Sequence, residues 1–144
     1  MGFWLGDEGS GGNLGKRLVT AFLHGKLPPD LHTAFAGQYG LDRLTVLDHA
    51  YNKPYPNRYF AHFVPFLSEH RHLPFVRELV CGAFSDFLAL YVARMPDTHR
   101  HPIHFVGSVA YYFADWIREL LAEKHLQAGR FTQVPIDGLL AYHQ

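Results

Sequence analysis

The chain has 144 residues, 48% of them hydrophobic and 15% aromatic, and its 13 Lys and Arg residues balance 13 Asp and Glu residues. A chain of this size buries one hydrophobic core and leaves no room for two ordinary domains, so we expect a single domain over residues 1–144. With no Lys and Arg cluster on a predicted face, the composition argues against nucleic-acid binding, and no apolar segment is long and uninterrupted enough to cross a membrane.

The chain opens on an acidic pair among glycines, Gly2-Phe3-Trp4-Leu5-Gly6-Asp7-Glu8-Gly9-Ser10-Gly11-Gly12, followed by a helical pattern over residues 13–24. Glycines remove the steric bar to positive φ, so we expect a loop whose backbone approaches a ligand closely. Asp7 and Glu8 would stay outside the helix as acceptors for hydroxyl groups, and Ser10 or Asn13 would cap the first helical N–H groups. This arrangement suits a polyol, although the same residues are ordinary turn formers and a capped helix entry needs no ligand.

Helical patterns, each ended by Gly or Pro, fill most of the chain as far as residue 95. We expect helices over residues 30–35, 41–51, 57–70 and 73–95. Asp30 would cap the first of them, and Gly37 and Gly40 would stop it. Two prolines within three residues make the segment 52–57 a rigid turn. The helix over 73–95 carries a broad apolar stripe and is expected to be well buried.

A short β-rich run over residues 103–106 ends in Gly107 and Ser108 and leads into a helical pattern that begins at Val109. A strand that turns at glycine into a helix presents N–H groups and the positive end of the helix dipole above the sheet edge, a frequent arrangement in nucleotide sites. Many α/β proteins place Gly-Ser at such a turn without a ligand, so both interpretations stay open.

Several residue types that often carry chemistry have ordinary interpretations here. The eleven histidines lack the i, i+4 spacing with an intervening Glu of a helical zinc site, so no metal ligand is predicted. Ser10 and Ser108 lack a hydrolase motif. After a predicted strand over 131–134, Asp137 fits a first-turn helix charge better than a catalytic carboxylate. The single cysteine, Cys81, excludes an internal disulfide framework and, with no export leader, fits a cytoplasmic protein.

The opening residues also resemble a known motif, Gly6-Asp7-Glu8-Gly9-Ser10-Gly11. This string, with Gly2 before it, is similar to the motif of the N-acetylglucosamine kinase branch of the sugar kinase and actin-like ATPase superfamily, which is grouped with the BadF/BadG-type ATPases. In those kinases the aspartate binds sugar hydroxyl groups, and the glycine five residues before it lies against the sugar ring. The resemblance therefore implies that Asp7 and Gly2 bind the substrate.

Two further stretches resemble nucleotide-binding segments of the same family. The run Val-Gly-Ser-Val over residues 106–109 matches a turn that lines the adenosine site, which implies nucleotide contacts at Gly107 and Ser108. The run Phe-Ala-x-Phe over residues 60–63 resembles a stretch whose alanine packs against adenine, which implies the same for Ala61. On chemistry alone, Ala61 fits equally a small residue on a packed helix.

The resemblance implies a helix-rich α/β fold: the C-terminal ribonuclease-H-like domain of the actin-like ATPase fold, with an incomplete sheet. It implies ATP-dependent phosphorylation of an amino sugar with ATP and Mg²⁺, in which this chain supplies part of the sugar and adenosine sites. The family's phosphate-binding hairpin and catalytic aspartate lie in an N-terminal kinase domain. No match for them precedes Met1, so we expect no catalytic base and no identifiable Mg²⁺ ligand here, and no turnover by the chain alone.

The absent domain bears on the expected partners. We expect the missing N-terminal kinase domain to be one partner, with the amino sugar and ATP as ligands. An exposed apolar face near Phe3, Trp4 and the Gly107 turn would favour a homo-oligomer.

Two alternatives stay open beside the kinase. The chain can be a non-catalytic module that binds sugar or nucleotide. It can also be a fragment of an activator-type ATPase resembling those of benzoyl-CoA reductase systems. The second alternative requires cysteines that bind an iron–sulfur cluster between subunits, and the single Cys81 of each chain argues against such a cluster.

Overall fold

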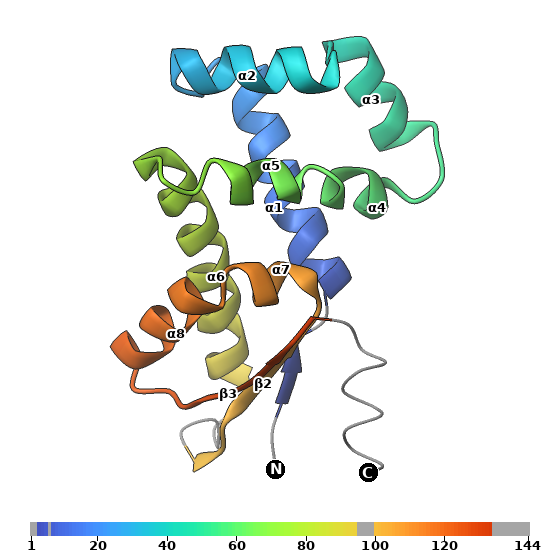
Figure 1. The fold of residues 1–144 in the computed structure, drawn as a ribbon. Helices are drawn as coiled ribbons and strands as arrows, with labels where there is room; N and C mark the ends of the chain where they lie inside the picture. Colours follow the sequence, from blue (N-terminus) through green and yellow to red (C-terminus); the bar gives the residue numbers. More distant parts are fainter. Residues whose placement is uncertain (1–2, 6, 95–99, 134–144) are drawn as a thin grey trace. The chain divides into compact units, whose positions relative to one another are not determined.

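The structure, a computed structural model, describes residues 3–5, 7–94 and 100–133, and for residues 3–10 and 91–94 it describes the backbone alone (Figure 1). The chain divides into two compact units, Met1–Ser10 with Val80–Gln144 and Gly11–Leu79. Two helices, α1 (Asp7–Leu23) and α6 (Pro74–Arg94), each begin in one unit and end in the other. That residues 1–144 form a single domain stays a prediction.

The first unit contains a small parallel sheet. Its strands are β1 (Phe3–Leu5), β2 (Ile103–Val106) and β3 (Ala128–Thr132), in the order β1-β2-β3. Both neighbouring pairs are parallel. Parallel strands need crossover connections, and here helices make them, so the predicted helix-rich α/β class is confirmed (Figure 1).

Two helices connect β2 to β3 and cover the sheet: α7 (Ser108–Tyr112) and α8 (Ala114–Glu123). α7 packs on β2 and β3, and α8 packs on β3. The side chains that close this core are fully buried: Phe105, Phe113, Ile117 and Leu121. Burying a side chain of this size stabilises the fold by about 1.5–3 kcal/mol. This packing supports the β2–α7 junction.

The second unit is helical and has an aromatic core. Besides parts of α1 and α6 it contains α2 (Pro29–Tyr39), α3 (Arg43–Tyr51), α4 (Pro56–Ala61) and α5 (Val64–Glu69). Phe35 lies at the centre, and its ring centroid is within 4.9–5.4 Å of those of four other rings, Phe22, Tyr39, Phe63 and Phe66. Tilted and edge-to-face aromatic pairs such as these add to the free energy gained by burial.

Local signals set several helix ends in the second unit. α2 ends at Gly40, whose left-handed backbone (φ 58°, ψ 38°) favours glycine and whose N–H donates to the carbonyl oxygen of Ala36. α3 begins after Asp42, whose side chain accepts a hydrogen bond of 2.7 Å from the backbone N–H of Thr45. Asp30, predicted as a cap, instead lies in the first turn of α2, and the predicted stop at Gly37 lies inside that helix.

The expected loop before residue 13 is wrong, because α1 already begins at Asp7. Its glycines serve packing in place of a loop. A Cβ at Gly15 would lie 1.7 Å from the carbonyl oxygen of Phe60, and one at Gly12 would lie 3.2 Å from the Asn57 side chain. The glycines therefore let the α1 backbone approach α4, and this tertiary contact outweighs their low helix propensity.

The expected helix over residues 57–70 is divided into α4 and α5. Pro65 lies in the first turn of α5, where its missing N–H cannot donate to the carbonyl oxygen four residues earlier. The predicted helix over residues 73–95 is confirmed as α6 as far as Arg94. The predicted closing helix with Asp137 lies outside the described residues. In the part of the chain that the structure describes, no helix combines the length and the apolar character that crossing a membrane requires.

Candidate functional site

Two strand-to-helix junctions lie beside each other at one edge of the sheet. β1 pairs in parallel with β2, with Leu5 opposite Phe105. Asp7 follows Leu5 by two residues and begins α1, and Gly107 follows Phe105 by two residues and precedes α7. Neighbouring strands lie about 4.8 Å apart, and in open α/β sheets ligands bind outside the carboxyl ends of the strands. The two stretches singled out in the sequence thus meet at the edge where a ligand would bind.

Asp7 is the first helical residue of α1, and this corrects the expectation that Asp7 and Glu8 stay outside the helix. An acidic residue in a first helical turn complements the helix dipole, so this position suits a carboxylate whether or not a ligand is bound. The backbone position alone is described for Asp7, and Gly2 lies outside the described residues. Sugar binding by these two residues stays a prediction.

The junction after β2 depends on Gly107. Its backbone has φ 123° and ψ 160°, a conformation that side chains larger than hydrogen rarely adopt. The Gly107 N–H donates to the carbonyl oxygen of Thr132 at 2.8 Å, and its own carbonyl oxygen accepts from the Tyr111 N–H at 3.2 Å. Gly107 is buried and Ser108 is half-buried. The turn is therefore tied to the end of β3 as well as to α7.

Ala61, the third predicted nucleotide contact, belongs to the other unit. It is the last residue of α4 and is half-buried. The residue before it, Phe60, is buried, and its carbonyl group lies against Gly15 of α1. Within its own unit, Ala61 thus lies on a packed helix, the ordinary interpretation given for it above. A contact with adenine stays a prediction.

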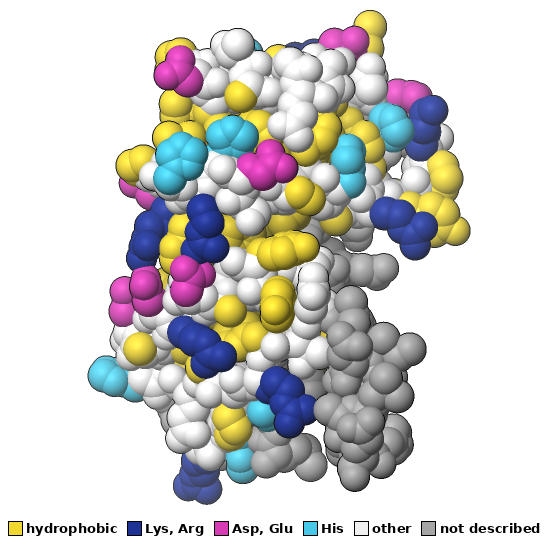
Figure 2. Space-filling view, viewed as in Figure 1, with side chains coloured by type: hydrophobic (Ala, Val, Ile, Leu, Met, Phe, Trp, Pro, Cys, Tyr) yellow, Lys and Arg dark blue, Asp and Glu magenta, His cyan; other side chains and the backbone are white. Residues whose placement is uncertain are grey.

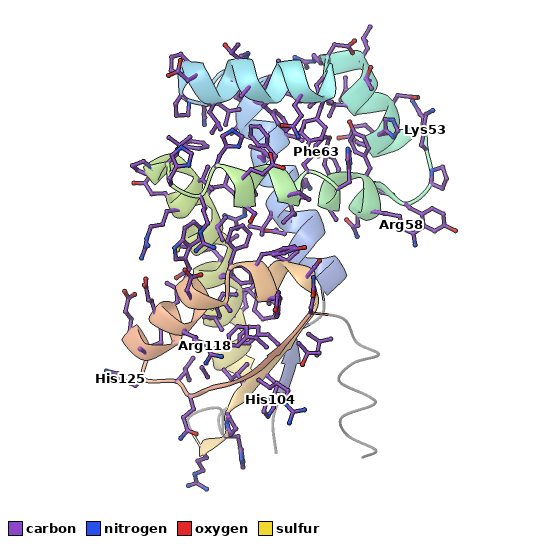
Figure 3. The ribbon with its side chains drawn as sticks, in the orientation of Figure 1. Lys53, Arg58, Phe63, His104, Arg118 and His125 are labelled. Atoms are coloured by element: carbon purple, nitrogen blue, oxygen red, sulfur yellow. The ribbon has the colours of Figure 1, made fainter. Side chains whose placement is uncertain are left out.

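The sequence interpretation did not include the residues that support the Gly107 turn from β3. Thr132 is buried, with an exposed fraction of 8%, and its backbone carbonyl oxygen accepts a hydrogen bond from the Gly107 N–H. Phe131 stacks on Phe105 with ring centroids 4.9 Å apart, and Arg118 of α8 lies over the Phe131 ring at 4.4 Å (Figure 3). A glycine inside a strand, Gly129, is a signal for a bulge or a close approach and could have pointed to this region.

The histidines of the second unit take part in packing. Figure 2 shows several histidine side chains on the surface of this unit. The His62 ring packs at a tilt against Phe63, and its Nδ1 faces the backbone carbonyl oxygen of Tyr59. The His70 ring packs at a tilt against Phe66, and its Nδ1 lies 2.9 Å from the backbone carbonyl oxygen of the same residue. Among the residues described, no three His, Cys, Asp or Glu side chains form a group that could hold a metal ion.

Three side chains of the second unit have shifted pKa values. Burial raises the pKa of Tyr59, and the negative charge of Asp42 adds to this shift. Burial likewise raises the pKa of Tyr39, with a contribution from Glu69. Hydrogen bonds from Thr45 lower the pKa of Asp42. These shifts follow from helix packing and capping.

Among the solved structures that match this chain is the crystal structure of a Porphyromonas gingivalis protein whose assignment as an N-acetylglucosamine kinase is provisional. The two structures superimpose with a TM-score of 0.86 and 39% sequence identity over 96% of this chain. The chain is similar to a sugar kinase. It spans 49% of the length of that protein. No protein-family model matches the sequence, and no curated protein matches it.

Proposed function

We propose that the chain is the C-terminal part of an ATP-dependent amino-sugar kinase of the N-acetylglucosamine kinase type. The observation that carries the proposal is the parallel pairing of β1 with β2, which brings the Asp7 junction beside the Gly107 junction. The similarity to the P. gingivalis structure, which covers 96% of the chain, supports the kinase type. A kinase needs its sugar and its nucleotide side by side, and one sheet edge offers both positions.

Each junction has a role in this proposal. The Asp7 carboxylate accepts hydrogen bonds from sugar hydroxyl groups, and Gly2 leaves room for the sugar ring. Gly107 and Ser108 contact the adenosine part of ATP, with Ala61 against the adenine. This division places the acceptor sugar on the β1 side and the nucleotide on the β2 side, so the transferred phosphoryl group would lie between them.

The remaining parts of a phosphoryl-transfer site are assigned elsewhere. When bound, Mg²⁺ would neutralise charge on the phosphate groups. The described residues offer no group that fits this ion, so no residue of the chain is assigned to it. The chain spans 49% of the kinase-like structure, and we assign the catalytic base and the phosphate-binding hairpin to an N-terminal kinase domain. On this proposal the chain is the ribonuclease-H-like C-terminal domain of an actin-like ATPase fold and is inactive alone.

The proposal is tested by calorimetry on the 144-residue chain with N-acetylglucosamine and with ADP. Asp7→Asn should weaken sugar binding at least about tenfold, because hydrogen bonds to a charged group are lost, and should leave ADP binding unchanged. Ser108→Ala should weaken ADP binding alone. Glu8→Gln is the matched control for loss of a negative charge in the same turn. A wild-type chain that binds neither ligand, or an Asp7→Asn variant that binds sugar normally, would contradict the proposal.

A second candidate is a binding module without catalysis, and it too fits a chain that spans 49% of the kinase-like structure. Complementation separates the two candidates. The chain is mixed with the N-terminal portion of the P. gingivalis relative, sugar, ATP and Mg²⁺, and phosphorylated sugar is measured. Transfer supports the kinase. Ligand binding without transfer, in a complex shown to be folded, supports the binding module.

A further inference from the structure

The pairing of β2 with β3 contains an irregularity just before the Gly107 turn. Ile103 pairs with Ala128, but Phe105 pairs with Phe131 and Val106 with Thr132. Between these pairs, one residue of β2, His104, lies opposite two residues of β3, Gly129 and Arg130, so β3 carries one extra residue. Such a bulge is rare between parallel strands and leaves a backbone group without its ladder partner.

The side chain of His104 occupies this irregularity. The Arg130 N–H donates to Nδ1 of His104 at 2.9 Å, so a side-chain nitrogen of β2 replaces the missing backbone acceptor (Figure 3). Because Nδ1 accepts, the imidazole proton must be on Nε2. Gly129 makes this contact possible, since a Cβ there would lie 2.5 Å from Nδ1 and 2.7 Å from Cε1 of His104. The imidazole and the glycine therefore fit each other.

The bulge decides which residues of β3 support the turn. Continued without it, the Ile103–Ala128 register would place Arg130 opposite Phe105 and Phe131 opposite Val106. A slip of one residue turns every side chain of a strand to the other face. With the bulge, Phe131 stacks on the buried Phe105, and the Thr132 carbonyl oxygen lies where it accepts the Gly107 N–H at 2.8 Å.

We propose that His104 is a positioning residue for the Gly107–Ser108 turn: its Nδ1 caps the β3 bulge, the bulge sets the register, and the register places the turn. The link to a ligand rests on the proposed function, in which this turn contacts the nucleotide. His104 itself is assigned no contact with substrate. Its role is to fix the backbone on which Gly107 and Ser108 lie.

Three variants test the role of the acceptor atom. Asn places its side-chain oxygen near the position of Nδ1, whereas Gln places it near the position of Nε2 and Leu has no acceptor. His104→Asn should retain the wild-type turn. His104→Gln and His104→Leu should both disturb it. A purely steric or packing role of His104 would not separate Asn from Gln in this way.

The first measurement is amide hydrogen exchange at Arg130 and Gly107 in the 144-residue chain. His104→Leu and His104→Gln should raise the exchange rates of both amides about threefold to tenfold, the effect of losing one net hydrogen bond. His104→Asn should leave both near wild type. If Arg130 alone responds, or if Asn behaves like Leu, the positioning role is wrong.

The second measurement is the dissociation constant for ADP. His104→Leu and His104→Gln should weaken ADP binding about threefold to tenfold, and His104→Asn should not. If the wild-type chain binds ADP and every variant binds it equally well, the link between the register and the nucleotide is wrong. If the wild-type chain does not bind ADP, the proposed nucleotide role fails, and the exchange rates alone then decide whether His104 positions the turn.

A double variant checks that His104 and Gly129 act together. Gly129→Ala alone should destabilise the chain and speed exchange at Gly107, because its Cβ meets the imidazole. Combined with His104→Ala, which removes the ring, the added cost of Gly129→Ala should fall. Additive effects of the two changes would show that they act independently and would contradict the proposal.

Discussion

The backbone carbonyl of Phe60 in α4 lies against Gly15 of α1, so closely that a Cβ on Gly15 would lie 1.7 Å from the oxygen. No side-chain rotation can relieve this contact, because the backbone of residue 15 fixes the position of a Cβ and the oxygen belongs to the backbone of Phe60. Gly15, three residues after the glycine-rich opening, is therefore a packing position against α4. This contact gives the sharpest stability prediction for the second unit.

Gly15→Ala should destabilise the chain by about 3 kcal/mol or more, because α1 and α4 must move apart. Gly37→Ala is a matched control: Gly37 lies within α2, and a Cβ there meets nothing within 4 Å. That change should stabilise the chain by about 0.5–1 kcal/mol through helix propensity. Urea unfolding measures both. Equal effects of the two substitutions would contradict the close approach.

Tyr59→Phe should stabilise the chain. The Tyr59 hydroxyl is buried and has no hydrogen-bond partner among the residues that the structure describes, and an unsatisfied buried hydroxyl costs about 1–3 kcal/mol. The ring itself, which stacks on His49 with centroids 4.0 Å apart, is unchanged by the substitution. A rise in melting temperature of about 2–4 °C for each kcal/mol is expected. A fall in melting temperature would show that the hydroxyl does have a partner.

The raised pKa of Tyr59 predicts that the stability of the chain falls at alkaline pH. Burial raises the pKa of Tyr59 above its usual value of 10.0. The folded state then holds the phenol proton more tightly than the unfolded state, so stability is complete below pH 10.0 and falls as the pH rises through the folded-state pKa. Tyr59→Phe should reduce this fall. Part of it should remain, because burial also raises the pKa of Tyr39.

Asp42→Ala should destabilise α3, because the Thr45 N–H loses its acceptor. Hydrogen bonds from Thr45 hold the pKa of Asp42 below its usual value of 3.8. The stabilisation is therefore present above pH 3.8 and is lost as the pH falls through the folded-state pKa. Asp42→Ser, which keeps a capping oxygen, should retain much of the stability and show no such acid dependence. Circular dichroism against pH measures both variants.

Gly107→Ala should cost about 1–3 kcal/mol of stability, because φ 123° disfavours any side chain. It should also weaken ADP binding, if the turn contacts the nucleotide as proposed. Gly25→Ala is the matched control: Gly25 also has a positive φ, 68°, in open space. It should lower stability without changing the dissociation constant for ADP. Equal losses of ADP affinity in both variants would mean that the effect comes from general destabilisation.

Much of the fold follows from local sequence patterns. Apolar periodicity predicts the long helix α6, and the run over residues 103–106 before Gly107 predicts β2 and its turn into α7. Proline and glycine act on their own φ angles and N–H groups, so their effects can be read without knowing the partners. Pro65 was such a signal for the break between α4 and α5, although the apolar spacing across it favoured one helix.

The sequence by itself thus determined the class of the fold, the β2–α7 turn and the residues that resemble a kinase site. Tertiary structure alone decided that α1 begins at Asp7, that β1 pairs with β2, and that His104 caps a bulge in β3. These three features depend on contacts between segments far apart in the chain. Helix propensity and alternation act only between near neighbours, and no local pattern specifies which distant backbone will meet Gly15 or His104.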